Sequence, residues 1–575
     1  MLSDGSDARW MYLSLIFYIA LFTVITCISV FILKNNFIAE GQPQSTPFVK
    51  DPKLEAILLH DGLNYSSSFT FVGNDDILYL EKQTGKVLRI VNGQMLDRPL
   101  LDVNVANYGE RGMLGIAAKT YDNHEYVFLY YTEIQTEDAA DSTNGTKPIG
   151  NRLYRYEFVN NSLINPTLLL DLPGNPGFYH VGGAITIGPD DNIYLPIGDL
   201  DHRTSAQNFK QGGKANGTSG ILRVSWDGKA VGNGILGNEF PLNLYYAYGI
   251  RNSFGIDFDP VTGTLWDTEN GPNFGDEINL VEPGFNSGFA KIQGIWEPNG
   301  EDKGRTVLKP KDLVDFAGKG KYRIPELIWE YTVGPSAIKF FNSSNFGQEY
   351  TNDIFVGNVN EETLYHFDLN GNRTGLDLSS GPPDRIARTP DGVREHRFAE
   401  RLGRISDVEV GPDGNLYVLS HVWNEDPNKR NSSIYRIAPA ISLDKTDWLT
   451  DTNNSITSGP RMDIDRVILN WKVLSSDYIP VKSDSYYNYT LDVSARDVNQ
   501  LHSKVFYFNS NRTQIGSDFV SNGKDGTFDD LLSRVIKTPH GTALVKLQVW
   551  VQPNLEMDSY FIVNNATVYS FPQRG

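Results

Sequence analysis

The segment PDDNIYLPIGD, residues 189–199, contains the unit that decides the fold, in which a polar turn leads into a short apolar strand carrying an aromatic residue. Related units occur as NDDILYLE (74–81), NHEYVFLYYT (123–132), VTGTLWDTENG (261–271), TNDIFVGNV (351–359) and PDGNLYVLSH (412–421). Short apolar runs bounded by Gly, Asn, Asp and Pro are typical of β-strands, and helical periodicity is nearly absent here. The sequence therefore predicts an all-β domain.

The spacing of these units predicts how many sheets the domain contains. Their aromatic markers are Tyr79, Phe128, Tyr194, Trp266, Phe355 and Tyr417, separated by 49, 66, 72, 89 and 62 residues. A propeller blade of four short strands needs about 40–50 residues, and longer steps indicate inserted loops. We predict a six-bladed β-propeller over residues 53–440. An irregular β-sandwich is the alternative, but this length exceeds that of a single sandwich.

The composition changes after Ala440, where residues 441–460 form a predicted linker. Residues 461–575 alternate apolar and polar positions in RVILNWKVL (466–474), YNYTLDVSA (487–495), TPHGTALVKLQVWV (538–551) and YFIVNNATV (560–568). This alternation predicts a β-sandwich, jelly-roll-like, that loosely resembles carbohydrate-binding domains. Aromatic side chains for stacking on a glycan would be Trp471, Trp550, Tyr486 and Tyr487, and packing in the core is their alternative role.

The amino-terminal region predicts a single membrane anchor. Residues 11–33, MYLSLIFYIALFTVITCISVFIL, contain no charged residue, and this length can span a bilayer as a helix. A cleaved signal peptide is the alternative, but no small-residue cleavage site follows the apolar run. We therefore expect a short tail at 1–10, a transmembrane helix at 11–33 and a linker at 34–52.

Sequence features outside the apolar run predict where the body lies. N-x-S/T sequons, which indicate an external location, start at Asn64, Asn144, Asn160, Asn216, Asn342, Asn372, Asn431, Asn453, Asn488, Asn511 and Asn565. Cys27 is the only cysteine, so no disulfide can form within the chain. A large external body without disulfides favours a prokaryotic cell surface, with the body extracellular or periplasmic. The formal net charge of −19 makes nucleic acid an unsuitable partner.

A histidine and an aspartate provide a candidate proton acceptor. His180 precedes Gly182 and Gly183, and Asp199 ends the segment quoted first. A neutral imidazole suits the removal of a hydroxyl proton, because its pKa lies near working pH, and a carboxylate can fix its tautomer. The two glycines would let a ligand approach the backbone. The pattern indicates a base for alcohol oxidation, although a lone loop histidine more often has no catalytic role.

Arg251 and Asn252 follow the strand-like run YYAYGI, residues 245–250. An arginine at a strand end can clamp a carboxylate or polarise a carbonyl oxygen, and closing a turn is its alternative role. Gly271 and Pro272 allow a bent backbone whose carbonyl groups can face one hard cation such as calcium. The neighbouring Asp276 and Glu277 offer carboxylate oxygens for a possible second calcium.

These residues also carry a family resemblance. GERGMLGIA (109–117), HVGG (180–183), AQN (206–208), GILRVSWDG (220–228), YGIRN (248–252), TGTLWDTENGP (262–272), GDEINLV (275–281) and GPDGNLYVLS (411–420) occur in an order that resembles the glucose/sorbosone dehydrogenase family. The resemblance covers roughly residues 55–440. It implies a six-bladed propeller that uses pyrroloquinoline quinone (PQQ) and calcium to oxidise sugars.

The resemblance also implies roles for individual residues. It makes His180 the general base, Asp199 its partner, and Arg251 a catalytic residue near the quinone. Gly271 and Pro272 become carbonyl ligands of calcium, and Asp276 and Glu277 match a second calcium region. Further cofactor contacts are implied at Glu110, Gln207, Asn252, Asn360 and Arg404.

Two positions depart from the family pattern. Asn360, in VGNVNEETLY (356–365), occupies a place where the family often has lysine, and Ser406, in GRISDV (403–408), replaces an arginine. Arg397 or Arg401 could substitute for the missing cations.

We therefore expect a PQQ- and calcium-dependent dehydrogenase that converts an aldose or related alcohol into a lactone and passes electrons to an external acceptor. A non-catalytic propeller that binds glycans or a protein partner, and a calcium-dependent lactonase, are the alternatives.

Overall fold

The computed structural model describes most of the chain after residue 46. The described residues are 47–135, 148–202, 208, 214–299, 302–304, 313–424, 426, 430–440, 448–450, 461–463, 472–476, 478–553 and 560–571. The predicted tail, the predicted anchor at 11–33 and most of the predicted linker at 34–52 lie outside these residues. Within the described part of the chain, no helix is both long and apolar enough to cross a membrane.

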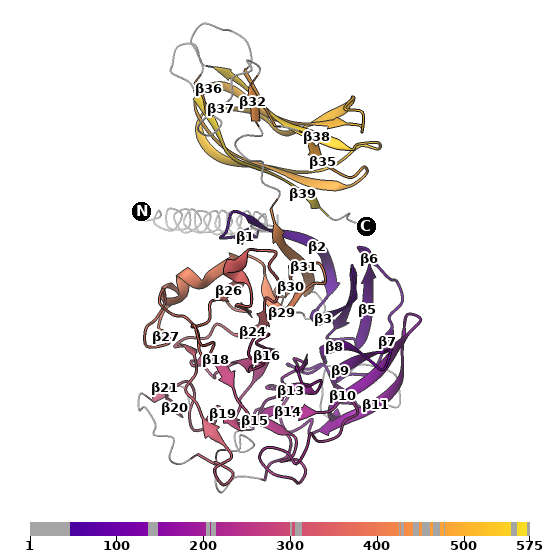
Figure 1. The fold of residues 1–575 in the computed structure, drawn as a ribbon, viewed down its shortest axis with the longest axis vertical. Helices are drawn as coiled ribbons and strands as arrows, with labels where there is room; N and C mark the ends of the chain where they lie inside the picture. Colours follow the sequence, from indigo (N-terminus) through magenta and orange to yellow (C-terminus); the bar gives the residue numbers. More distant parts are fainter. Residues whose placement is uncertain are drawn as a thin grey trace, which may run out of the picture. The chain divides into compact units, whose positions relative to one another are not determined.

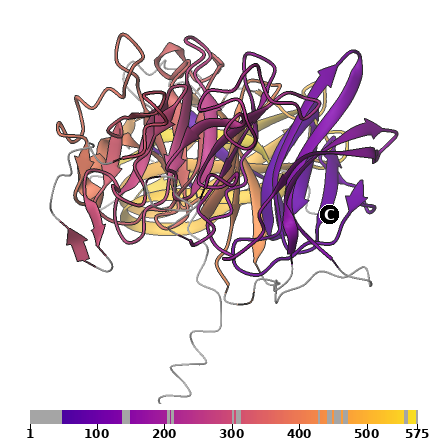
Figure 2. The ribbon, with the colours of Figure 1, turned by 90° about the horizontal axis from the view of Figure 1, so that it is seen from below.

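Six mostly antiparallel sheets follow one another along the described residues between 48 and 439. Figure 1 shows them as the blades of a ring, and Figure 2 shows the twist of the long strands of blades 1 and 2. Blade 1 contains β3 (Ser66–Gly73), β4 (Asp76–Glu81), β5 (Lys86–Val91), β6 (Gln94–Met95) and β7 (Leu101–Asp102). Blade 2 contains β8 (Met113–Tyr121), β9 (His124–Ile134), β10 (Pro148–Val159) and β11 (Ser162–Leu172).

Blades 3 and 4 contain additional short strands from later segments. Blade 3 contains β12 (Thr186–Ile187), β13 (Ile193–Ile197), β14 (Gly220–Val224), β15 (Tyr245–Tyr248), β19 (Phe285–Asn286) and β22 (Lys321–Tyr322). Blade 4 contains β16 (Ser253–Phe258), β17 (Leu265–Glu269), β18 (Asp276–Val281), β23 (Leu327–Trp329) and β27 (Ile386–Ala387). A separate two-stranded sheet is formed by β20 (Glu297–Asn299) and β21 (Asp302–Gly304).

Blades 5 and 6 each include a strand from the amino-terminal side of the propeller. Blade 5 contains β24 (Pro335–Phe340), β25 (Ile354–Asn358), β26 (Thr363–Phe367), β28 (Arg397–Glu400) and β1 (Phe48–Val49). Blade 6 contains β29 (Arg404–Val410), β30 (Leu416–His421), β31 (Asn431–Pro439) and β2 (Leu54–Asn64). Among the described residues, the short 3₁₀ helices η3 (Gln348–Tyr350) and η4 (Pro390–His396) lie in loops. The predicted linker at 34–52 is therefore too long, because β1 pairs with β28.

The repeated turn motif has the same structure in two blades. The Asp190 carboxylate accepts hydrogen bonds from the Asn192 backbone N–H at 3.2 Å and from the Tyr194 hydroxyl at 3.0 Å. Asp413 accepts the equivalent bonds from Asn415, at 3.1 Å, and from Tyr417, at 3.0 Å. The aspartate thus fixes both the turn and the aromatic ring that follows it. All six aromatic markers lie on the second strand of their blades.

The amino-terminal strand β2 closes the ring. It pairs with β31 from Leu54 opposite Pro439 to Asn64 opposite Asn431. The Leu63 side chain is 1% exposed and packs in an apolar cluster that includes Phe69 from blade 1. Closure therefore joins the first and last blades through both backbone pairing and side-chain packing.

The carboxy-terminal strands form a second sheet with its own core. Its strands are β32 (Trp448–Thr450), β33 (Arg461–Asp463), β34 (Lys472–Ser476), β35 (Ile479–Pro480), β36 (Tyr486–Phe508), β37 (Gln514–Lys537), β38 (Leu544–Pro553) and β39 (Tyr560–Phe571). The first half of β36 pairs with β39 and its second half with β38, and side chains from both halves share one apolar cluster. Because β32 belongs to this sheet, the predicted linker at 441–460 overlaps the folded domain.

Closure of the ring predicts the effect of a core substitution. Leu63→Ala should destabilise the protein by about 2–5 kcal/mol, because it leaves a cavity between blades 1 and 6. Val261→Ala is the control, since Val261 is 59% exposed. The midpoint of urea unfolding measures both changes. Equal midpoints for the two variants would show that β2 contributes little to closure.

Candidate active site

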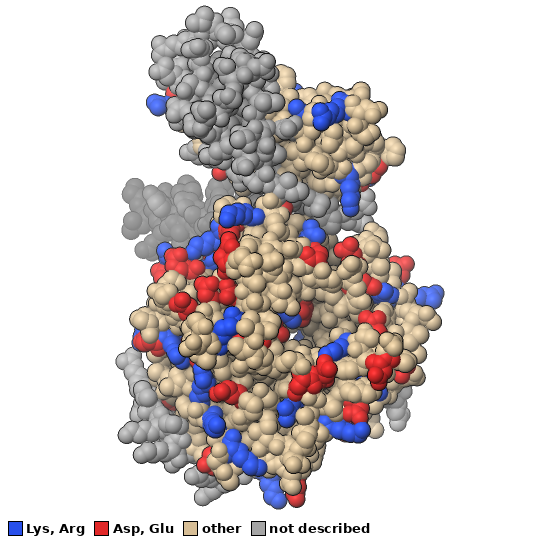
Figure 3. Space-filling view, viewed as in Figure 1, with Lys and Arg blue, Asp and Glu red and all other residues tan. Residues whose placement is uncertain are grey.

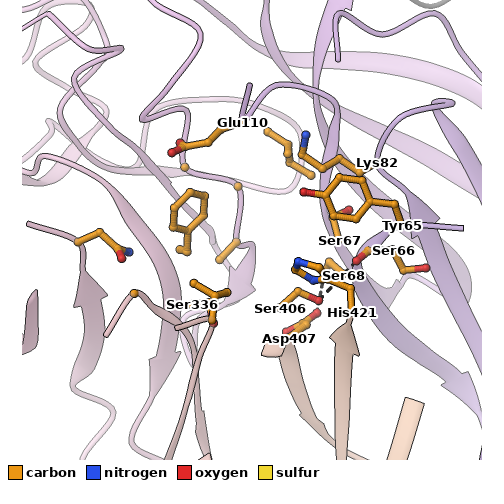
Figure 4. Close-up of a pocket in the computed structure, with 18 of the residues that line it drawn as sticks. Tyr65, Ser66, Ser67, Ser68, Lys82, Glu110, Ser336, Ser406, Asp407 and His421 are labelled. Atoms are coloured by element: carbon orange, nitrogen blue, oxygen red, sulfur yellow. Dashed lines mark hydrogen bonds between the residues drawn. The ribbon is translucent and has the colours of Figure 1, made fainter. Parts of the chain in front are cut away.

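A cavity with both apolar and polar lining residues lies among the innermost strands of the propeller. It has a volume of about 210 Å³. Figure 4 shows Tyr65, Lys82 and His421 on one side of it, with Glu110 and Ser336 around the rest of the space. Ser406 and Asp407, from β29, also line the cavity. We call this space the central cavity.

His180 and Asp199 form a close pair beside this cavity. The Nδ1 atom of His180 lies 2.6 Å from Oδ1 of Asp199, and the aspartate is 1% exposed. Asp199 is acceptor-only when ionised, so this contact assigns the imidazole proton to Nδ1. Within the described residues, Nε2 of His180 has no hydrogen-bond partner. The arrangement leaves a basic nitrogen free for a ligand, and the catalytic role of the pair stays a prediction.

Glu110 holds His180 in place from the opposite direction. Its Oε2 atom accepts hydrogen bonds from the His180 backbone N–H at 2.6 Å and from the Asn252 side chain at 3.1 Å. His180 has a φ of 59°, a left-handed conformation that non-glycine residues seldom adopt. The charge-assisted bond to Glu110 compensates for this strain and fixes the imidazole.

Glycine is favoured at positions 182 and 183, after His180, for two different structural reasons. Both line the central cavity. A Cβ atom at Gly182 would lie 2.2 Å from the carbonyl oxygen of Pro196, so this position requires glycine for backbone packing. Gly183 has a φ of 146°, which also favours glycine.

Arg251 is fixed by neighbouring backbone groups. Its Nη1 atom donates to the carbonyl oxygen of Asn270 at 2.9 Å, and its backbone N–H donates to Glu269 at 2.8 Å. Burial lowers the pKa of the Arg251 guanidinium, and the negative charge of Asp199 is the largest effect that raises it. Oδ1 of Asn252 is buried without a partner among the described residues. These two side chains therefore keep polar groups available beside the His180–Asp199 pair.

The Gly271–Pro272 turn is shaped by Asp276. Its two carboxylate oxygens accept hydrogen bonds from the backbone N–H groups of Gly271, Val333 and Gly334 at 2.7–2.8 Å. Among the described residues, the carbonyl oxygens of Gly271 and Pro272 accept no hydrogen bond. Free carbonyl oxygens suit a hard cation. Asp276 thus supports the turn, and its predicted contact with a second calcium remains a prediction.

Glu277 belongs to a group of buried acids in blade 4. It accepts hydrogen bonds from Gln293 at 2.9 Å and Asn279 at 3.1 Å. Glu269 is opposite it on β17, and both carboxylates have raised pKa values because they are buried. Asp267, two residues before Glu269, is also fully buried with a raised pKa. The sequence analysis missed Glu269 and Asp267, which occur inside the quoted TGTLWDTENGP motif.

Asn360 and Arg404 are not joined to this hydrogen-bonded group. Gln207 lies outside the described residues. Asn360 is exposed and donates to the carbonyl oxygen of Thr332 at 3.3 Å. Arg404 stacks on the ring of Trp423, 4.3 Å from its centroid.

Neither arginine suggested as a substitute cation is placed on the cavity wall. Arg397 pairs with Glu400 at 2.9 Å and with Glu361 at 3.7 Å, so nearby acids already neutralise it. Arg401 is exposed. The structure therefore does not support substitution by Arg397.

Four residues on the cavity wall and its edge were missed by the sequence analysis. Lys82, Tyr65 and His421 line the cavity, and Arg430 donates to the Tyr65 hydroxyl at 2.7 Å. They follow or precede strands of blades 1 and 6, which meet only when the ring closes. No local pattern marks them.

Two further groups lie outside the cavity. Asp353, His366 and Asp368 have ligand atoms within 4.8 Å of one another on blade 5, a geometry that can hold a metal. In the second sheet, Tyr487 is 7% exposed and therefore packs in the core, while Trp550 donates to Gln548 at 3.0 Å. Tyr486 is partly buried, and Trp471 lies outside the described residues. A glycan-binding role for these aromatic residues stays a prediction.

The fold and the cavity define a β-propeller protein with a histidine–aspartate pair at its centre. Residues 63–428 match the model of the glucose / sorbosone dehydrogenase family, and the chain belongs to this family. The match includes every predicted cofactor and metal residue.

Relatives and solved structures agree with this assignment. The chain is 25% identical over 367 residues to the aldose sugar dehydrogenase of Escherichia coli, covering 63% of this chain and 89% of that protein. It is 27% identical over 299 residues to quinoprotein glucose dehydrogenase B of Acinetobacter calcoaceticus, covering 48% of this chain and 61% of that protein. The apo-form structure of the soluble E. coli aldose sugar dehydrogenase has a TM-score of 0.50 at 21% identity, covering 67% and 99%. That structural likeness shows the shared fold.

Burial of His421 predicts a pH-dependent stability. Burial and the positive charges of Arg430, Arg404 and Lys82 lower the pKa of His421 from 6.5 to about 3. The neutral, buried His421 stabilises the folded state fully above pH 6.5. This stabilisation is lost as pH falls toward 3, because the unfolded chain takes up the proton first. His421→Phe should therefore reduce the loss of unfolding free energy between pH 6.5 and 5 by about 2 kcal/mol.

Urea unfolding at the two pH values measures this difference. The control is His124→Phe, since His124 is exposed and should leave the pH dependence unchanged. An identical pH dependence in the wild type and His421→Phe would contradict the assigned pKa.

Proposed function

We propose that this protein is a PQQ- and calcium-dependent dehydrogenase that oxidises an aldose or related alcohol to a lactone. Membership of the glucose / sorbosone dehydrogenase family supports an oxidoreductase. The observation that carries the proposal is the His180–Asp199 pair, with Nε2 left free beside a cavity lined by polar groups. Electrons would then pass to an external acceptor.

Residues joined to the cavity-lining Glu110 and Asn270 suit an anionic quinone and a hard cation. Arg251 and the unpaired Oδ1 of Asn252 can hold polar groups of the cofactor. The free carbonyl oxygens of Gly271 and Pro272 fit calcium. When bound, PQQ supplies the acceptor for the hydride that leaves the alcohol carbon.

The protein side chains would handle the proton. Nε2 of His180 takes the proton of the substrate hydroxyl while the carbon–hydrogen bond breaks. Asp199 keeps the other imidazole nitrogen protonated and stabilises the imidazolium that results. Glu110 fixes the histidine backbone, and the bond to Asp199 fixes the imidazole ring. The step yields the lactone, one proton on His180, and one hydride, which carries the second hydrogen and two electrons to the acceptor.

The proposed location is a cell membrane, with the body extracellular or periplasmic on a prokaryotic cell surface. The uncharged run at 11–33 and the sequons after it support this proposal. Figure 3 shows acidic and basic side chains interspersed over one face of the propeller, which suits a neutral sugar better than a polyanion such as nucleic acid. A glycan partner for the carboxy-terminal sheet is also part of the proposal.

Reconstitution tests the enzyme directly. The full-length chain, supplied with PQQ and calcium, should oxidise members of an aldose panel with an artificial electron acceptor. Removal of calcium with a chelator should abolish turnover, because the carbonyl ligands alone cannot polarise the cofactor. Absence of turnover on the whole panel would overturn the proposal.

A substitution tests the base. His180→Ala should lower kcat by at least about 100-fold, since general base catalysis contributes about 10²–10⁴-fold. Binding of PQQ and calcium should remain unchanged. The control His202→Ala removes an exposed histidine close in sequence and should leave kcat unaltered. Retained turnover in His180→Ala would remove this residue from the mechanism.

A non-catalytic binding propeller is the second candidate, because Asn360 and Ser406 provide no cationic contact. Titration of PQQ into the calcium-loaded chain, followed by absorbance, separates the two functions. No response at micromolar PQQ favours the binding propeller. Hydrolysis of a lactone without any quinone would instead identify a calcium-dependent lactonase.

A further inference from the structure

Three basic side chains gather where blades 1 and 6 meet at the central cavity. Lys82 lines the cavity, and its Nζ lies 5.3 Å from the centroid of the Tyr65 ring. The guanidinium of Arg430 lies 4.8 Å from the same centroid. Arg404 and Arg430 also stack on the Trp423 ring, at 4.3 and 4.1 Å. The aromatic rings of Tyr65 and Trp423 thus hold the three cations together.

Glu110 is the acidic side chain whose charge acts on Lys82. Within the described residues, Lys82, Arg404 and Arg430 form no ion pair with a carboxylate, whereas Arg89 and Arg152 in nearby strands do. Lys82 instead donates to the carbonyl oxygens of Gly109 and Arg111, at 3.0 and 2.7 Å. In a chain with a formal net charge of −19, three basic side chains without a direct ion pair among the described residues indicate a place for an external anion.

His421, on the same wall of the cavity, has a polar atom without a partner among the described residues. It is 8% exposed, and its Nδ1 atom is buried without a hydrogen-bond partner among the described residues. Figure 4 shows its ring beside Tyr65 and Ser406 in the cavity. A neutral imidazole can donate one hydrogen bond from a ring nitrogen, and a carboxylate oxygen would satisfy it. Lys82 and His421 therefore lie on the cavity wall, and Arg430 and Arg404 lie directly behind it, bound to Tyr65 and paired with His421.

We propose that Lys82, Arg404 and Arg430, with Tyr65 and His421, form an anion subsite that binds carboxylate groups of the ligand held in the central cavity. The inference rests on the proposed function where the ligand is PQQ, which carries three carboxylates. Under that function, Lys82 and Arg430 provide the cationic contacts that Asn360 and Ser406 do not. Arg430 lies beyond residue 428, where the family match ends.

The charge state of Lys82 couples this subsite to pH. Burial and the charge of Arg430 lower the pKa of Lys82 to about 7, and Glu110 opposes this effect. An arriving carboxylate favours the charged amine, so binding takes up a proton. Affinity for the anion should therefore weaken as pH rises above about 7. An acidic sugar substrate also carries a carboxylate, so this subsite suits either the cofactor or such a substrate.

Equilibrium titration of PQQ into the calcium-loaded full-length chain tests the subsite without measuring turnover. Lys82→Met and Arg430→Gln should each raise Kd at least about 10-fold, because a charge-assisted contact is lost. Matched controls are Lys119→Met and Arg155→Gln, which change a lysine and an arginine that lie over aromatic rings on blade 2. The controls should keep Kd within about twofold of the wild type. Unfolding midpoints verify that each variant is folded.

A second probe, citrate, separates the subsite from the proposed function. Citrate is a tricarboxylate without redox chemistry, and it should raise the unfolding temperature of the wild type more than that of Arg430→Gln. Unchanged PQQ affinity in both variants would overturn the subsite and leave the dehydrogenase proposal intact. No PQQ binding, together with citrate stabilisation that the variants lose, would retain the subsite and overturn the PQQ proposal. No response to either anion would overturn both.

Discussion

The site depends on the hydrogen bonds that the Glu110 carboxylate accepts. One of its oxygens joins the backbone of His180, before blade 3, to the side chain of Asn252, before blade 4, while Glu110 itself precedes blade 2. Hydrogen bonds to a charged group contribute about 1.5–3 kcal/mol each, enough to hold His180 in its left-handed conformation. Three separate loops thereby act as one unit. The polar centre of the propeller is therefore rigid even though it is built from loops.

The repeated sequence unit predicts the blades because its physical basis is local. Asp190 and Asp413 each bind an amide and a tyrosine hydroxyl within four residues, so the turn, the strand and the aromatic ring are encoded together. Domain boundaries are less predictable. Strand β1 and strand β32 lie in segments that look like linkers, and only pairing with distant strands makes them part of a sheet.

The same distinction explains which candidate residues the sequence marks. His180, Asp199 and Arg251 lie beside glycines and strand ends that mark them in the sequence, and the structure places them in one hydrogen-bonded group. Lys82 and Arg430 follow no motif. Tyr65 and Arg430 are 365 residues apart, and their contact exists only because β2 pairs with β31. A single sequence contains no local signal for such a pair.

Ring closure also determines when the cavity wall can form during synthesis of the chain. Strand β2 leaves the ribosome early, but its partner β31 follows only after five blades have been made. Until then Tyr65 has no Arg430 to bind, and β2 has no strand to pair with because β31 is missing. A nascent chain therefore cannot capture an anion at this wall, and a truncated product lacks the complete pocket. Ligand retention thus reports on whether the whole propeller has been completed.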